Sequence, residues 1–160
     1  MKTAFYPGNG SDRRKLVAAQ AHEGERSDGV ANDLSYREID AAFDKAKELR
    51  ANAMMVGPST FFTVRRNQIV ELAARDALPT IYGQRDYWTA GGLMSYATDL
   101  TDAYRQAGVY SGKILHGAQP TELPVVQSAK FELLINLKVA KSLGLTFPPG
   151  LVAIADEVIE

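Results

Sequence analysis

The sequence predicts an α/β protein, a doubly wound parallel sheet flanked by helices. Short apolar segments alternate with amphipathic segments of helical spacing, and several of the apolar segments stop at glycine or proline. The connections between the apolar segments are long enough for the helical crossovers that parallel strands require. With 160 residues, 46% of them hydrophobic, the chain can bury the core of one ordinary domain.

The chain opens with an apolar stretch at residues 2–6, which indicates a strand that stops at the PGNG turn of residues 7–10. Ser11 can cap a helix that runs to about Gln20, and the polar residues 22–33 indicate a loop.

The middle of the chain predicts the core of the sheet. A Ser35–Glu38 capping box precedes a run of apolar residues at helical spacing. The sequence of residues 53–56 (AMMV) is apolar throughout, which is typical of a strand buried on both faces. The elements expected here are helices at 36–50 and 62–76 and strands at 53–56, 79–82 and 93–96.

The last third predicts a long amphipathic helix over residues 101–115, capped by Thr101 and stopped by Gly117. The further elements expected are an extended connection at 120–124, a strand at 130–135, a helix from Asn136 to Gly144 and a last helix at 150–158.

Composition excludes several classes of site. The 18 Lys and Arg against 19 Asp and Glu give a net charge of −1, which argues against nucleic acid as a partner. Without cysteine, and with only His22 and His116, the chain lacks the residues for a thiolate nucleophile, a Cys-ligated metal or a His-rich metal site. We expect no metal and no cofactor.

The N-terminus has no unbroken apolar run, so the chain as written predicts no export signal and a cytoplasmic location.

Candidate binding residues follow from the expected topology, because ligands of open parallel sheets bind at the carboxyl ends of the strands. Asn9, Ser59 and Thr60 offer polar groups there, Arg85 can pair with a carboxylate, and Tyr96 ends the last central strand. The aromatic residues that could stack on a ligand are Phe61, Tyr82, Tyr87 and Trp88. The same residue types also build ordinary turns and caps.

Catalytic motifs are weak. The PGNGSD turn lacks the Gly-Lys-Ser/Thr of a phosphate loop, and no G-x-S-x-G elbow is present. Carboxylate pairs such as Asp40 with Asp44, or Asp86 with Asp99 or Asp102, are explained as a solvated helix face or as caps. We therefore expect no catalytic residue.

Two stretches in order, AGGLMSY at residues 90–96 and KFELLINLK at 130–138, resemble the substrate-binding proteins of ABC transporters that include tryptophan- and tyrosine-type binders. The resemblance covers about residues 36–160. It implies one lobe of a type I periplasmic binding protein, a small-molecule ligand such as an amino acid, an ABC permease as partner and a periplasmic location. It also implies ligand-facing roles for the five candidates Asn9, Ser59, Thr60, Arg85 and Tyr96.

Two such lobes need about twice this length, so the resemblance implies a second lobe over 1–98, a hinge-crossing helix over 99–117 and a returning segment over 118–160. A single lobe offers half of the ligand contacts, which predicts roughly millimolar affinity. Without the first lobe, the apolar face of the helix over residues 101–115 is uncovered. This helix is expected either to fold back on its own lobe or to form a homodimer through residues 101–115. The alternatives are a non-binding remnant or self-associating interaction module and, third, a small α/β enzyme.

Overall fold

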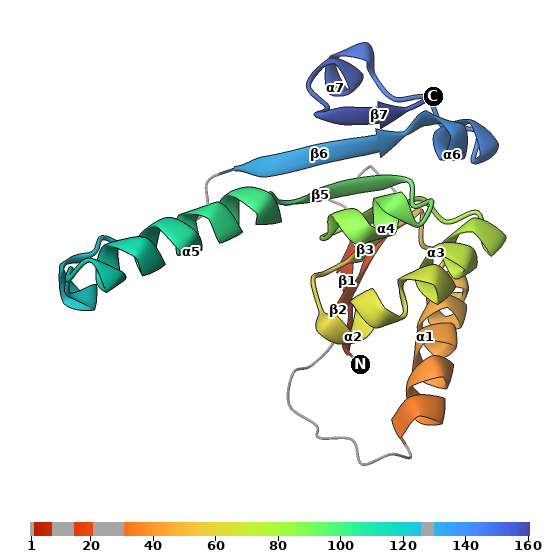
Figure 1. Cartoon of the computed structure of the whole chain (residues 1–160). Coiled ribbons are helices and arrows are strands. Elements are labelled where there is room, and N and C mark those ends of the chain that lie inside the picture. Colours follow the sequence, from red (N-terminus) through yellow and green to blue (C-terminus); the bar gives the residue numbers. More distant parts are fainter. Residues whose placement is uncertain (1, 8–14, 21–30, 126–129) are drawn as a thin grey trace.

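In its described residues, the computed structural model of the protein has one sheet of seven strands whose spatial order β1 to β7 follows the chain (Figure 1). The structure describes residues 2–7, 15–20, 31–125 and 130–160. The strands are β1 (Lys2–Pro7), β2 (Lys15–Gln20), β3 (Ala53–Val56), β4 (Thr80–Tyr82), β5 (Met94–Thr98), β6 (Phe131–Asn136) and β7 (Glu157–Ile159). The helices are α1 (Ala31–Glu48), α2 (Thr60–Val64), α3 (Arg66–Arg75), α4 (Arg85–Thr89), α5 (Leu100–Leu115), α6 (Leu137–Ser142) and α7 (Pro149–Ala153), with a 3-10 turn η1 at Pro120–Glu122.

The α/β class is confirmed, and the parallel part of the sheet runs from β2 to β5. Both flanks depart from an all-parallel sheet. β1 pairs antiparallel with β2, with Lys2 opposite Gln20, and β6 pairs antiparallel with β5. β7 then runs parallel to β6. The expected parallel placement of the first strand is therefore wrong.

The helix expected over residues 11–20 is also wrong, because residues 15–20 form strand β2. A short apolar run fits one face of a helix or a buried strand equally well, and here pairing on both sides with β1 and β3 decides the outcome. The Ser35–Glu38 pair does not begin a helix either, since α1 starts at Ala31 and contains both residues.

The core lies on one face of the sheet, where α1 to α4 pack. Met54 and Val56 of β3 are buried in a cluster with Ile39, Phe43, Phe62, Ile69 and Tyr82, whereas Met55 between them is 40% exposed. Alternation along a strand places Met55 on the opposite face. The expectation that this strand is buried on both faces is wrong for the described part of the molecule.

The remaining elements agree with the sequence only in part. Asn136 caps α6 through a hydrogen bond that its Oδ1 accepts from the Val139 amide at 3.1 Å. The expected helix over 62–76 is split into α2 and α3 at Arg65. Residues 120–122 form η1 rather than extended chain, and the last expected helix stops at Ala153. The β-branched pair Val158-Ile159 then adds β7 to the edge of β6.

Helix α5 projects from the body of the molecule as an arm, and the chain returns along it to β6 (Figure 1). Asp99, not the expected Thr101, caps this helix, accepting from the Asp102 amide at 3.1 Å. The helix ends at Leu115, and the expected stop at Gly117 is confirmed by its φ of +97°.

Candidate functional site

Two loops meet at the carboxyl edge of the parallel strands. Residues 57–59 follow β3, and Gly83-Gln84 follows β4. The Gly83 amide donates to the Val56 carbonyl at 2.9 Å. A Cβ at Gly83 would lie 2.9 Å from Pro58 Cδ and 3.1 Å from Pro58 N, so the two loops touch and glycine is needed at this contact.

Ser59 occupies the N-cap position of α2 with extended backbone (φ −163°, ψ 134°), but its side chain makes no capping hydrogen bond. Its carbonyl oxygen accepts from both the amide and the hydroxyl of Thr63, at 2.9 and 2.8 Å. Thr63 Oγ1 also lies within hydrogen-bond distance of Gln84 Oε1, which connects α2 to the next loop. Ser59 is buried and Thr60 is exposed at the start of α2.

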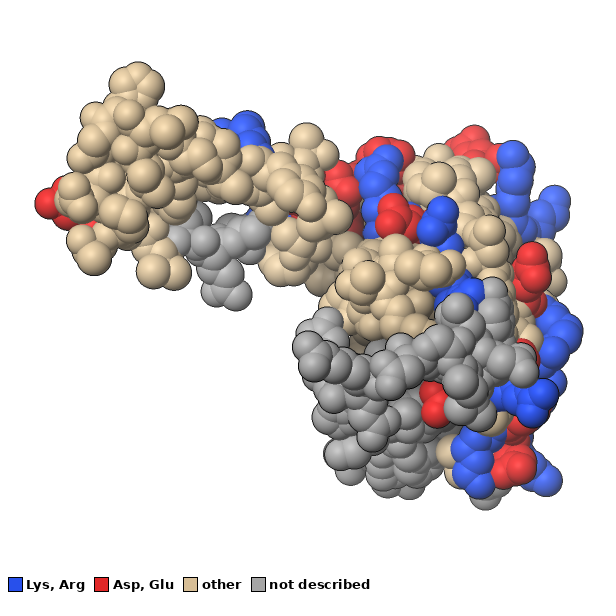
Figure 2. Space-filling model, turned by 60° about the horizontal axis from the view of Figure 1, so that its bottom comes forward, with Lys and Arg blue, Asp and Glu red and all other residues tan. Residues whose placement is uncertain are grey.

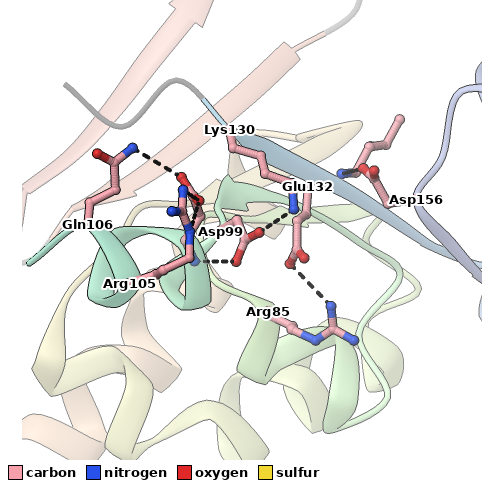
Figure 3. A network of polar contacts seen from close by, with 9 residues as sticks. Arg85, Asp99, Arg105, Gln106, Lys130, Glu132 and Asp156 are labelled. Carbon is pink, nitrogen blue, oxygen red and sulfur yellow. Dashed lines mark hydrogen bonds and ion pairs between the residues drawn. The ribbon is translucent and has the colours of Figure 1, made fainter. Parts of the chain in front are cut away.

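Arg85 begins α4 and is held by two carboxylates of the same chain. Its Nη1 lies 3.1 Å from Glu132 Oε2 on β6 (Figure 3), and its Nη2 lies 2.5 Å from Glu157 Oε1 on β7. Its guanidinium carbon is 5.6 Å from the centre of the Trp88 ring. The hydrogen bond to Glu157, followed by that to Glu132, raises the pKa of Arg85. The charge that was expected to meet a ligand carboxylate is therefore already paired.

Tyr96 lies apart from these groups. Its neighbours Ser95 and Ala97 are buried under the helices, so Tyr96 points to the opposite face of the sheet, where it is 54% exposed. Its ring stacks on Phe131 with the ring centroids 5.4 Å apart. The structure thus brings Ser59, Thr60 and the start of α4 to one edge and leaves Tyr96 on another surface. Asn9 lies outside the described residues.

Three of the expected stacking aromatics belong to the core. Tyr82 and Tyr87 stack on each other with centroids 4.7 Å apart, and burial raises the pKa of Tyr87 to about 12. Trp88 is also buried. Only Phe61 of that set is partly accessible beside the two loops, and it packs against Phe62.

A second polar cluster fixes the base of α5 (Figure 3). Lys130 Nζ lies 2.7 Å from Asp99 Oδ2, and the Asp99 amide donates to the Lys130 carbonyl at 3.0 Å. The hydrogen bond from Lys130 is the main cause that lowers the pKa of Asp99. These contacts tie the end of β5 to the start of β6, where the chain leaves and re-enters the body.

Sequence reasoning missed the partners of Arg85. Glu132 and Glu157 lie 47 and 72 residues further along the chain, and nothing in the sequence links either of them to Arg85. Gln84 was within the expected loop but was not selected, because its contact with Thr63 depends on tertiary structure.

Other kinds of site are not indicated by the described parts of the chain. They contain no group of three or more His, Cys, Asp or Glu side chains that could hold a metal. No helix within them is long and apolar enough to cross a membrane. An apolar hollow of about 690 Å³ lies between α6 and α7. The Asn136 amide before α6 donates to the Leu93 carbonyl before β5, so this hollow is at the opposite edge of the sheet from the two loops.

Comparison with known proteins gives a family and a fold. The family model described as ABC transporter substrate binding protein matches residues 31–159. A search of curated proteins found no match.

Three of the solved structures that are similar to the chain come from different bacteria. An ABC domain in complex with L-Trp from Streptococcus pneumonia is 24% identical, with a TM-score of 0.70 over 78% of this chain and 42% of that one. A conserved domain protein from Vibrio cholerae is 21% identical, with a TM-score of 0.68 over 77% of this chain and 41% of that one. A substrate-binding protein with adhesive properties from Clostridium difficile, in a ligand-free, open structure, is 17% identical, with a TM-score of 0.58 over 78% of this chain and 41% of that one. The chain therefore spans about two fifths of the length of these structures.

Proposed function

Because the chain belongs to the ABC transporter substrate-binding protein family, we propose that it supplies one ligand-binding lobe of such a protein, with the ligand at residues 57–60 and 83–85. The observation that carries the proposal is the contact between these two loops at the carboxyl edge of β3 and β4. Ligands of open α/β sheets bind at this edge. The role is binding without a chemical step.

The groups at this edge suit a small zwitterionic or amide-bearing molecule. Thr60 is exposed and carries a hydroxyl, the Gln84 amide lies beside Thr63, and Arg85 supplies the positive charge. An amino acid has a carboxylate for Arg85 and an ammonium for the carbonyl and amide oxygens. The tryptophan bound to the Streptococcus pneumonia domain supports this ligand class.

The wider context is part of the same proposal. Residues 1–98 would form the lobe, 99–117 the hinge-crossing helix and 118–160 the returning segment. The partner would be an ABC permease, and the site of action would be outside the cytoplasmic membrane, where importers collect their solutes.

Arg85 has to exchange partners when a carboxylate ligand binds. Glu157 is the partner to be displaced, because it is 47% exposed and its side chain can move into water, whereas Glu132 is 22% exposed. The Arg85–Glu157 pair therefore competes with the ligand. Removing the competing charge is expected to strengthen binding.

The test is equilibrium binding of L-tryptophan, followed by ligand-detected NMR. Thr60→Val keeps the side-chain shape and removes one hydroxyl, which is expected to weaken binding about 3- to 10-fold. Thr146→Val is the matched control, since Thr146 is also exposed but lines the hollow between α6 and α7. Glu157→Gln is expected to strengthen binding, and Arg85→Gln to weaken it. Equal affinities for the two threonine variants would contradict the proposed position of the ligand.

A further inference from the structure

We propose that the ion pair between Asp99 and Lys130 sets the direction and the stiffness with which α5 leaves the sheet. The proposal starts from the projection of α5 as an arm, which Figure 2 shows extending away from the body. The helix has 16 residues and none of them is buried, so packing against the body does not hold it in one direction. The direction of α5 therefore depends on the contacts at its base.

The sheet ends immediately before this base. Thr98 of β5 pairs with Phe131 of β6, and the next residue of each strand, Asp99 and Lys130, extends the pair. The Asp99 amide donates to the Lys130 carbonyl at 3.0 Å, and Lys130 Nζ lies 2.7 Å from Asp99 Oδ2. One backbone contact and one side-chain contact thus continue the β5–β6 pair up to the first residue of α5.

Asp99 connects this end of the sheet to the helix, because its two carboxylate oxygens have different partners. Oδ1 accepts from the Asp102 amide at 3.1 Å and caps the first turn of α5, whereas Oδ2 accepts from Lys130. The Asp99 side chain is 7% exposed, so the carboxylate cannot turn into water without moving its surroundings. A rotation of α5 about its base has to break one of these two contacts.

The other polar side-chain contacts of α5 in the described part of the chain do not reach the sheet. Arg105 and Gln106 contact Asp102 of the same helix. The Tyr110 hydroxyl donates to the carbonyl of Pro124, which is part of the arm. The ion pair at the base is therefore the side-chain contact that attaches α5 to the sheet.

Lys130 has a second acidic neighbour in Glu132, two residues further along β6. Both carboxylates raise the pKa of Lys130, and the hydrogen bond to Asp99 is the largest cause. Glu132 is itself bound by Arg85 at 3.1 Å, which leaves Asp99 as the contact of Lys130. The same strand thus carries one residue that holds the base of α5 and one that holds Arg85 (Figure 3).

One consequence rests on the proposed function, in which α5 crosses to the other lobe of a binding protein. Lobes of this kind close by rotating about the segments that join them. Rotation at the base of α5 would work against the Asp99–Lys130 pair, which would therefore favour one orientation of the lobes. The stiffness of the arm itself is a property of this chain without ligand, so its test does not depend on the ligand-binding role.

Double electron–electron resonance on the full chain measures the direction of α5, because the absence of native cysteine allows two spin labels at chosen residues. Ala41→Cys on α1 and Ser111→Cys on α5 place both labels at exposed positions. Ser111 lies about 17 Å along the helix from its start, so a swing of about 15° moves the label by about 4 Å. The doubly labelled chain is expected to give one narrow distance distribution.

Removing either charge of the pair is expected to loosen the arm. Lys130→Met keeps most of the side-chain length and is expected to broaden the distribution by about 4 Å or more. Asp99→Asn keeps a residue that can cap α5 and is expected to broaden it as much. The two changes together are expected to add nothing, because both remove the same contact. Lys130→Arg keeps the charge and is expected to keep the narrow distribution.

Arg105→Met is the matched control, because Arg105 lies 2.7 Å from a carboxylate within α5 itself. It is expected to leave the distribution unchanged. Lys130 is 62% exposed, so Lys130→Met is expected to keep the cooperative thermal unfolding of the wild type. A Lys130→Met variant with a narrow distribution, an Arg105→Met variant that broadens it equally, or a distribution that is already broad without either change would overturn the proposal.

Discussion

Gly92 lies at a point where the core leaves no room for a side chain. A Cβ there would be 2.6 Å from Tyr82 Cε2 and 2.8 Å from the carbonyl oxygen of Tyr87. These two rings are stacked and buried, and the backbone of α4 cannot move without displacing them. The glycine thus allows α4 to pack closely on β4, which in turn positions Arg85.

Gly92→Ala is therefore expected to lower the free energy of unfolding by about 1 to 3 kcal/mol, as overpacking of a core does. Gly150→Ala serves as the control, since its added methyl group meets nothing within 4 Å. Urea denaturation of both variants checks the prediction. A Gly92→Ala variant as stable as Gly150→Ala would show that the contact between α4 and β4 is looser than described.

At the scale of elements, Asp76 joins α1 to the end of α3. Its side chain is 3% exposed, and its Oδ1 lies 2.7 Å from Lys47 Nζ of α1 and 2.7 Å from Arg75 Nε. The hydrogen bonds from Arg75 and Lys47 lower the pKa of Asp76 below its usual value of 3.8. A lowered folded-state pKa means that the carboxylate stabilises the fold above the unfolded-state pKa and loses this effect as the pH falls through the folded-state value.

Asp76→Asn is expected to lower the free energy of unfolding by up to about 1 kcal/mol near neutral pH, because the two cations are half-exposed and can be hydrated instead. Thermal unfolding between pH 7 and pH 3 measures the difference from wild type. The difference in the free energy of unfolding between wild type and Asp76→Asn is expected to be constant above about pH 5 and to become smaller below about pH 4. A stability difference that grows as the pH is lowered would contradict the ion pair assigned to Asp76.

The elements that the sequence predicted well are those with a long periodic pattern or a clear cap. Helix α5 and the Asn136 cap of α6 are examples, because their signals are local. Strands β2 and β7 were predicted as helix, since a short apolar run acquires its conformation from the strand beside it.

For the candidate site, the sequence predicted which residues follow the strands but not the contacts that these residues make. The sequence placed Ser59, Thr60 and Arg85 after strands, and the structure brings their loops together. It could not indicate that Glu132 and Glu157 hold Arg85, because that contact depends on the order of β5, β6 and β7 in the sheet. The position of Tyr96 on the opposite face depends on which face the helices cover.

At the scale of the whole molecule, the proposed function makes the chain one side of a two-sided binding site. It spans about two fifths of the length of the similar solved structures, and one edge of its sheet carries the proposed ligand groups. If half of a micromolar binding energy of about 8 kcal/mol is available to a single lobe, the remaining roughly 4 kcal/mol corresponds to millimolar affinity. We therefore expect a polypeptide of these 160 residues to bind amino acids weakly.

The most direct test of the account is a chemical-shift titration of the uniformly ¹⁵N-labelled chain with L-tryptophan, with resonances assigned. We expect saturable shifts with a dissociation constant of the order of 1 mM, confined to the amides of residues 57–60 and 83–85 and of Glu132 and Glu157, which hold Arg85. Shifts centred on the hollow between α6 and α7, or none with any of the common amino acids at concentrations well above 1 mM, would contradict the claim that this edge of the sheet binds the ligand.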